Sequence, residues 1–257
     1  GANNVAVGHD ALVSNTTGAN NVAVGSLALD ANSSGVQNVA IGKDTLGNNT
    51  TGGYNTAVGQ NAMRDHTTGS YNTVVGQDAL RFNTTTSSHV AIGYGALGAN
   101  TSGVNNVAVG ATALDANTTG DRHVAVGIGA LGSNTTGIRN TAVGASTLGA
   151  NTTADYNVAM GYAALLSNTT GTQNVAVGAS ALDANTTGQN NSALGYNALG
   201  ANTTGQSNVA VGNYTLNSNS TGEKNTALGR GSLADNTTAD NNTAVGYQAL
   251  TLNTTGT

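Results

Sequence analysis

The chain has 257 residues, of which 7% are charged, a net charge of −5, and no Cys, Pro or Trp. This charged fraction is far below the roughly 25% of ordinary soluble domains, and bulky apolar residues are too scarce for a thick globular core. Dispersed cations argue against nucleic-acid binding, no apolar run reaches the ~20 residues of a membrane helix, and zero Cys excludes disulfides and thiolate metal sites.

The dominant feature is an unbroken 17-residue repeat. The chain divides into fifteen rows, from GANNVAVGHDALVSNTT (1–17) to ADNNTAVGYQALTLNTT (239–255), and the register never slips. The consensus is G-x-x-N-V-A-V-G-x-x-A-L-x-x-N-T-T. A constant short period means that one structural unit is stacked on the next. We therefore predict an all-β solenoid over residues 1–257, with fifteen 17-residue coils and two short strands in each coil.

The first predicted strand covers positions 4–7 of each row. Val at positions 5 and 7 lies on one face of such a strand, and Ala at position 6 points the other way. A second strand is expected to include Ala and Leu at positions 11 and 12. We predict that the valines and leucines form the inner core, which in the first two rows comprises Val5, Val7, Leu12, Val22, Val24 and Leu29.

Glycine occupies position 8 in every row, beginning with Gly8, Gly25 and Gly42. It predicts a corner that needs a positive φ or a close approach of two backbones. The absence of Pro fits the same fold, because each coil must donate and accept backbone hydrogen bonds on both sides.

Asn at positions 4 and 15 and Thr at positions 16 and 17 predict polar ladders. Stacked coils bring like residues about 4.8 Å apart, so amides and hydroxyls can bond along the stack. The first members are Asn4, Asn21, Asn15, Asn32, Thr16 and Thr17. The Asn-Thr-Thr segments are also glycosylation sequons. The ladder interpretation is favoured, because an inward-facing Asn could not also carry a sugar.

Thin coils of this kind favour further burial through oligomerisation. Ala at position 6 would form a flat stripe suited to close packing, which predicts a homotrimer, a lateral bundle or a head-to-tail polymer. The alternative is that Ala and Gly line a tight bend within one monomer. The first and last rows show no capping sequence, and the chain begins without Met. We therefore expect a fragment of a longer fibre, because solenoid ends are normally capped.

No group of residues predicts catalysis, a metal site or a cofactor. His89 and His123 share position 4 but lie two coils apart, and His66 stands at position 15, so each is interpreted as replacing Asn in a ladder. Asp recurs at positions 10 and 13 but never in adjacent coils at one position. A solvated surface is the better interpretation of these carboxylates.

The eight Tyr residues all stand at variable positions of the repeat. Exposed aromatics can stack on sugars or bury at an interface, and they are equally common as plain strand-surface residues. The candidates for a binding surface, all at position 9, are Tyr94, Tyr162, Tyr196 and Tyr247.

The rows GTQNVAVGASALDANTT (171–187) and ADNNTAVGYQALTLNTT (239–255) resemble arrays in phage tail-fibre-like and bacterial surface proteins. The N-V-A-V-G core also resembles the S-V-A-I-G motif in the β-roll heads of trimeric autotransporter adhesins, whose coils have about 14 residues. The present repeat is three residues longer, and no anchor or coiled-coil stalk is visible. The resemblance implies an extracellular, trimeric fibre or adhesin shaft.

The leading hypothesis is thus a structural shaft that is not an enzyme. Two binding alternatives stay open. One is an ice-binding surface, which the files of Thr suggest, although adjacent Thr at positions 16 and 17 point to opposite faces. The other is an adhesin surface that binds cell-surface glycans through the exposed Tyr.

Overall fold

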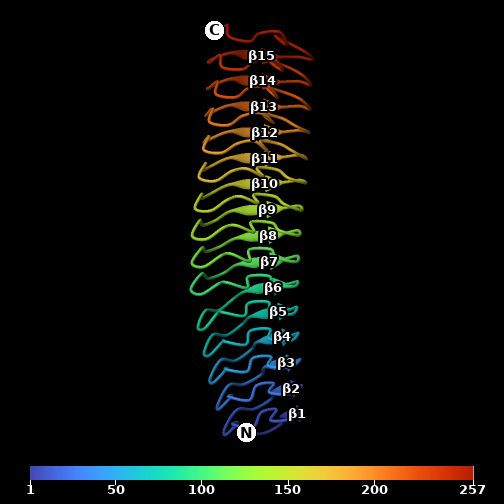
Figure 1. The fold of residues 1–257 in the computed structure, drawn as a ribbon, viewed down its shortest axis with the longest axis vertical. Helices are drawn as coiled ribbons and strands as arrows, with labels where there is room; N and C mark the ends of the chain where they lie inside the picture. Colours follow the sequence, from blue (N-terminus) through green and yellow to red (C-terminus); the bar gives the residue numbers. More distant parts are fainter. Residues whose placement is uncertain (257) are drawn as a thin grey trace. The chain divides into compact units, whose positions relative to one another are not determined.

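The computed structural model describes residues 1–256 and is all-β, with one three-residue strand in each repeat (Figure 1). The chain divides into two compact units, residues 1–128 with β1–β8 and Gly129 onward with β9–β15. The strands are β1 (Val5–Val7), β2 (Val22–Val24), β3 (Val39–Ile41), β4 (Thr56–Val58), β5 (Thr73–Val75), β6 (Val90–Ile92), β7 (Val107–Val109), β8 (Val124–Val126), β9 (Thr141–Val143), β10 (Val158–Met160), β11 (Val175–Val177), β12 (Ser192–Leu194), β13 (Val209–Val211), β14 (Thr226–Leu228) and β15 (Thr243–Val245).

Within each unit the strands pair in parallel and in sequence order, and residues 17 apart are partners. Val5 pairs with Val22, and Val158 pairs with Val175. The chain therefore makes one coil in every 17 residues, as the repeat predicts. Because each coil lies on the previous one, like residues form continuous files along each unit, and the β-solenoid prediction is confirmed.

The second strand predicted for each coil is wrong. Positions 9–14 form turns, and the residue at position 12 has a left-handed conformation, with φ of 56° at Leu12 and 52° at Leu29. A bulky side chain rarely adopts this conformation, which costs roughly 1–2 kcal/mol. Backbone hydrogen bonds to the next coil offset this cost. The N–H of Leu12 donates to the Ala28 carbonyl, and the N–H of Leu29 donates to the Thr45 carbonyl, each at 3.1 Å.

The predicted core is half right. Leu12 and Leu29 are buried, but the strand faces are reversed. Val5 and Val7 are 50% and 58% exposed, and Val22 and Val24 are only half-buried, whereas Ala at position 6 is fully buried from Ala23 onward in both units. A 17-residue coil is narrow, and the leucine at position 12 fills most of its interior. The space opposite is small and holds Ala in every row except that of Val74, so the side chains at positions 5 and 7 point outward.

The lateral stripe of alanines is therefore not a surface. The alternative, in which these alanines line the inside of one coil, is the arrangement observed. The interior is built from Ala or, once, Val at position 6, Ala, Thr or Ser at position 11, and Leu or Met at position 12.

Position 8 needs glycine for both of the predicted reasons. Gly8, Gly25 and Gly42 have φ of 138°, 139° and 133°. A Cβ on Gly25 would lie 2.4 Å from the Gly42 carbonyl oxygen in the next coil. No other residue can therefore turn the chain at this corner without separating the coils.

Candidate functional site

The first polar ladder is formed by the asparagines at position 4. The amide nitrogen of Asn21 donates to the Gly35 carbonyl at 2.9 Å and to Oδ1 of Asn4 at 3.2 Å. Its own Oδ1 accepts the backbone N–H of Asn38 at 2.9 Å. Each of these side chains thus hydrogen-bonds one coil to the next. Its burial costs little free energy, because both the nitrogen and the oxygen of the amide have hydrogen-bond partners.

The asparagines at position 15 form the second ladder. Asn32 is buried, and its amide nitrogen donates to Oδ1 of Asn15 at 3.0 Å and to the Gly35 carbonyl at 3.2 Å. The sequon asparagine therefore points inward, as the ladder interpretation requires. This burial opposes glycan attachment at Asn32.

Threonines at position 16 add a third file of bonds. The hydroxyl of Thr16 donates to the Ser33 carbonyl at 2.9 Å, and the N–H of Thr17 donates to the same carbonyl at 3.0 Å. The position 16 hydroxyl is thus engaged between coils. Thr17, which is exposed, joins the ladder through its backbone.

Three histidines lie inside these ladders, as predicted. His66, His89 and His123 are buried. The N–H of His89 donates to Oδ1 of Asn72 at 3.0 Å, and that of His123 donates to Oδ1 of Asn106 at 2.9 Å, which are the contacts that an Asn at this position makes. Because His89 is buried inside its own coil, its ring is not presented to another chain.

Two of the histidines belong to one buried polar cluster. Nδ1 of His66 lies 3.0 Å from Oδ1 of Asn83, whose amide donates to the Thr86 hydroxyl. That hydroxyl lies 2.8 Å from Nε2 of His89, and Nδ1 of His89 accepts the N–H of Asn106 at 3.3 Å. In this cluster His66 and His89 stand where other rows have a ladder asparagine, and Thr86 stands where most rows have glycine at position 1. The cluster links four successive coils.

This cluster makes the first unit sensitive to acid. Burial lowers the pKa of His89 to about 4, with a smaller contribution from the nearby His66, while Asp121 opposes the shift. Burial also lowers the pKa of His66. The unfolded chain therefore binds protons between pH 6.5 and about 4 that the folded chain does not.

We expect stability to be fully present above about pH 6.5 and to fall by about 3 kcal/mol for His89 alone as the pH approaches 4. His89→Asn restores the usual ladder residue, so the stability that this variant loses between pH 6.5 and 4 should be smaller by about 3 kcal/mol than that of the wild type. Urea unfolding from pH 7 to pH 4 measures it. His9→Asn is the control, because His9 is exposed. Equal pH dependence of His89→Asn and the wild type would contradict the assignment.

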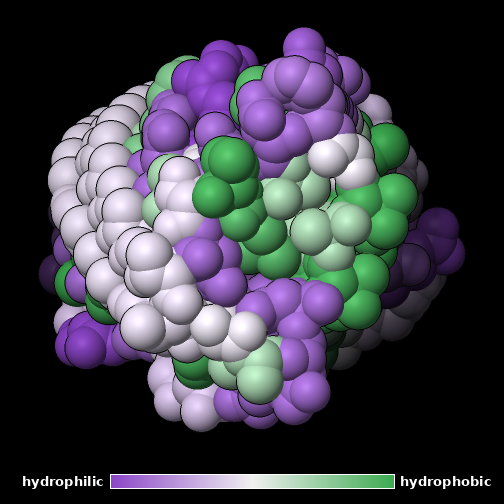
Figure 2. Space-filling view, turned by 90° about the horizontal axis from the view of Figure 1, so that it is seen from below, coloured by the Kyte–Doolittle hydropathy of each residue, from purple (hydrophilic) through white to green (hydrophobic). Residues whose placement is uncertain are grey.

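The outer face of the sheet carries the side chains at positions 5 and 7, which we call the valine face. Position 7 is Val, Ile, Leu or Met in every row, and position 5 is Val, Thr or Ser. Ile41, Ile92, Met160, Leu194 and Leu228 are between 38% and 51% exposed. Figure 2 shows hydrophobic atoms gathered on the N-terminal coil and along one side of it. Large exposed apolar patches are uncommon on monomeric proteins and are typical of interaction surfaces.

The four candidate tyrosines are exposed, and the three in the second unit stand in coils that are not adjacent. Tyr94 lies in the first unit and the others in the second, and Tyr196 stacks edge-to-face on Tyr214 with ring centres 5.2 Å apart. Away from these positions, Tyr54 and Tyr71 stack in parallel at 5.0 Å.

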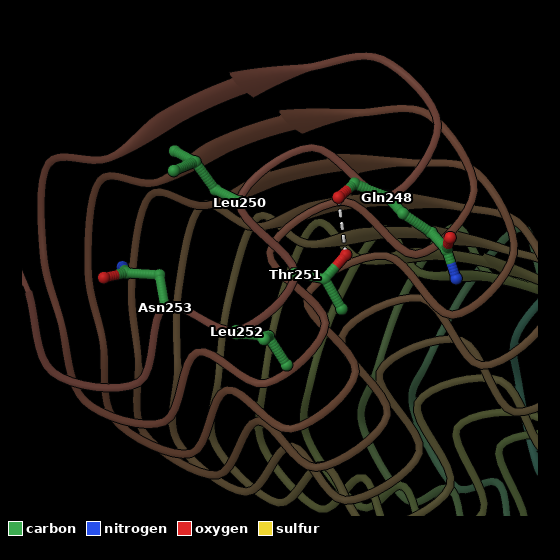
Figure 3. Close-up of a pocket in the computed structure, with 5 residues that line it drawn as sticks. All are labelled: Gln248, Leu250, Thr251, Leu252 and Asn253. Carbon is green, nitrogen blue, oxygen red and sulfur yellow. Dashed lines mark hydrogen bonds between the residues drawn. The ribbon is translucent and has the colours of Figure 1, made fainter.

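A hollow of about 610 Å³ is the open side of the last coil (Figure 3). Leu250 and Asn253 point into the coil, and the Thr251 hydroxyl donates to the Gln248 carbonyl at 2.6 Å. These are ordinary repeat positions without a neighbour above them.

Over residues 1–256 we find no group of three or more His, Asp or Glu side chains arranged to hold a metal ion. The same residues include no helix with the length and hydropathy to cross a bilayer. Comparisons with family models, curated proteins and solved structures give no match to this chain.

Proposed function

We propose that this chain is a structural segment of an extracellular fibre or adhesin shaft, and that it associates with copies of itself through the valine face. The observation that carries the proposal is that an interior held by hydrogen-bonded ladders lies behind an exposed apolar sheet face. Most coils repeat the same ladders, and histidine replaces the ladder asparagine in the others, which suits a stiff shaft. The resemblance to surface-fibre repeats implies the extracellular location.

The valine face is the surface that self-association would bury. Parallel sheets are normally covered on both faces, and here the interior covers only one. If each outward side chain exposes roughly 60 Å², the strands β1–β8 present on the order of 900 Å², against about 800 Å² per partner in a standard interface. A homotrimer or another lateral bundle would remove this face from water.

Substitution of the valine face tests the proposal. Ile41→Glu combined with Ile92→Glu places two charges on the face while leaving the interior unchanged, because both side chains point outward. An uncompensated charge in an interface costs several kcal/mol, so we expect the dissociation constant to rise more than about 100-fold. Sedimentation velocity should show oligomers for the wild type and monomers for the variant.

The matched control is His9→Glu combined with Gln60→Glu, which adds the same residues at exposed position 9. It should sediment like the wild type. Electron microscopy of the native material should show fibres. Short separate monomers in the wild-type sample would contradict the proposal, as would equal sedimentation of all three proteins.

A further inference from the structure

A second hollow lies on the turn side of the first unit, around Gly95. Gly95 and Gly98 occupy positions 10 and 13 of the sixth row, where neighbouring rows carry side chains. A Cβ added to Gly95 would meet no atom within 4 Å. The missing side chains leave a hollow of about 310 Å³ between the coils below and above. This volume is at the lower end of small-ligand sites.

Two exposed aromatic rings line the hollow. Tyr94 is 59% exposed and Phe82, the only Phe in the chain, is 49% exposed. The Arg81 guanidinium lies 5.0 Å from the centre of the Phe82 ring. Aromatic rings with one free face are suited to the apolar face of a flat ligand.

Polar groups lie beside these rings. Oδ1 of Asp78 accepts from the Asn61 amide at 2.9 Å and from Nη1 of Arg81 at 3.3 Å, so its carboxylate is held in place. Nε of Arg81 is buried and has no hydrogen-bond partner. Asp115, from the next coil, also lines the hollow, and burial raises the pKa of its carboxyl group. The hollow thus brings carboxylate acceptors, the Arg81 side chain and apolar rings together.

We propose that this hollow binds one pyranose ring of a glycan. The rings of Tyr94 and Phe82 pack against the C–H face of the sugar, the carboxylates of Asp78 and Asp115 accept bonds from its hydroxyls, and Arg81 donates to a sugar oxygen. This binding site is separate from the valine face and does not depend on the fibre proposal.

A smaller hollow in the second unit shares the glycine, tyrosine and arginine but has no carboxylate. Gly231 also stands at position 10, and a hollow of about 200 Å³ beside it is lined by Tyr214, Tyr247 and Arg230. Glycine at position 10, with tyrosine and arginine from nearby positions, thus opens a hollow in each unit. Gly129, also at position 10, has tyrosine at neither of the corresponding places.

The test is titration with the methyl glycosides of glucose, galactose, mannose and N-acetylglucosamine, followed by ligand-observed NMR. All proteins carry Gly231→Asn, which fills the smaller hollow. Gly95→Asn fills the larger one, and the left-handed φ of 63° at Gly95 suits Asn, as at Asn61. Tyr94→Ser removes one ring and introduces serine, which already occurs at position 9 of the repeat as Ser26.

We expect at least one glycoside to bind the Gly231→Asn parent, and each of Gly95→Asn and Tyr94→Ser to weaken binding at least about tenfold. The controls Gly129→Asn and Tyr162→Ser change the same repeat positions elsewhere and should stay within about twofold of the parent. Circular dichroism confirms that each variant is folded. No binding of any glycoside, or equal binding by Gly95→Asn and Gly129→Asn, would overturn the proposal.

Discussion

Gly110→Ala should unfold the first unit at temperatures at which the wild type is stable. Gly110 has φ of 139°, and a Cβ at this position would lie 2.4 Å from the Gly127 carbonyl oxygen and 2.6 Å from its carbon. Both atoms belong to the backbone of the next coil, so relief requires the coils to separate. Conformational strain of this type costs about 1–3 kcal/mol before the steric clash is added.

We expect a total loss of more than about 4 kcal/mol, in the range reserved for severe defects. Thermal unfolding followed by circular dichroism measures it. Gly129→Asn is the matched control: its φ is 63° and its added Cβ meets no atom within 4 Å, so it should lose less than about 1 kcal/mol. Similar unfolding temperatures for the two variants would show that position 8 is not a close backbone contact.

Ala176→Asp and Val177→Asp should differ strongly in their effect on stability, although the two residues are neighbours in β11. Ala176 is fully buried, and Val177 is half-buried on the valine face. An unpaired carboxylate at position 6 would be trapped inside the coil, which costs at least about 3 kcal/mol. At position 7 the same carboxylate reaches water.

We therefore expect Ala176→Asp to lose the strand signal or to unfold at much lower urea concentration. Val177→Asp should keep the fold and lose no more than about 1 kcal/mol, as other surface changes do. Urea unfolding below the concentration of self-association separates folding from assembly. If Val177→Asp were instead the less stable variant, valine rather than alanine would face the interior, which would refute the observed strand orientation.

The sequence alone predicts the solenoid, because a 17-residue period repeated without a slip permits only a stack. It also predicts the glycine corner and both asparagine ladders, since files of identical polar residues satisfy one another only when stacked. His89 follows from the same reasoning, because a ring nitrogen can replace an amide oxygen as the acceptor for the N–H of Asn106.

The orientation of the strand could not be predicted in the same way. Alternation in a three-residue strand separates Val22 and Val24 from Ala23 but does not say which side faces inward. Hydrophobicity favours the valines, whereas the width of the coil, which is known only from its turns, favours the alanine. Those turns depend on leucines such as Leu29 in a left-handed conformation, which local preference disfavours.

The hollow at Gly95 was also missed, although a signal existed. Position 10 carries Asp, Asn, Ser or a larger residue in most rows and glycine in only three, and two of these glycines have a tyrosine within one coil. A glycine at position 10 with a tyrosine within one coil is the pattern that both hollows share. Searching for tyrosines at a constant position selected Tyr162 as well, which lines neither hollow.

The native mass of the purified chain at neutral pH tests the central claim most directly. Exposure of the valine face in every coil predicts a species of two or more chains, and three times the 25.1 kDa of one chain is the expected mass. A single species of 25.1 kDa at tens of micromolar protein would contradict it, because an isolated coil stack would then keep its apolar sheet face in water.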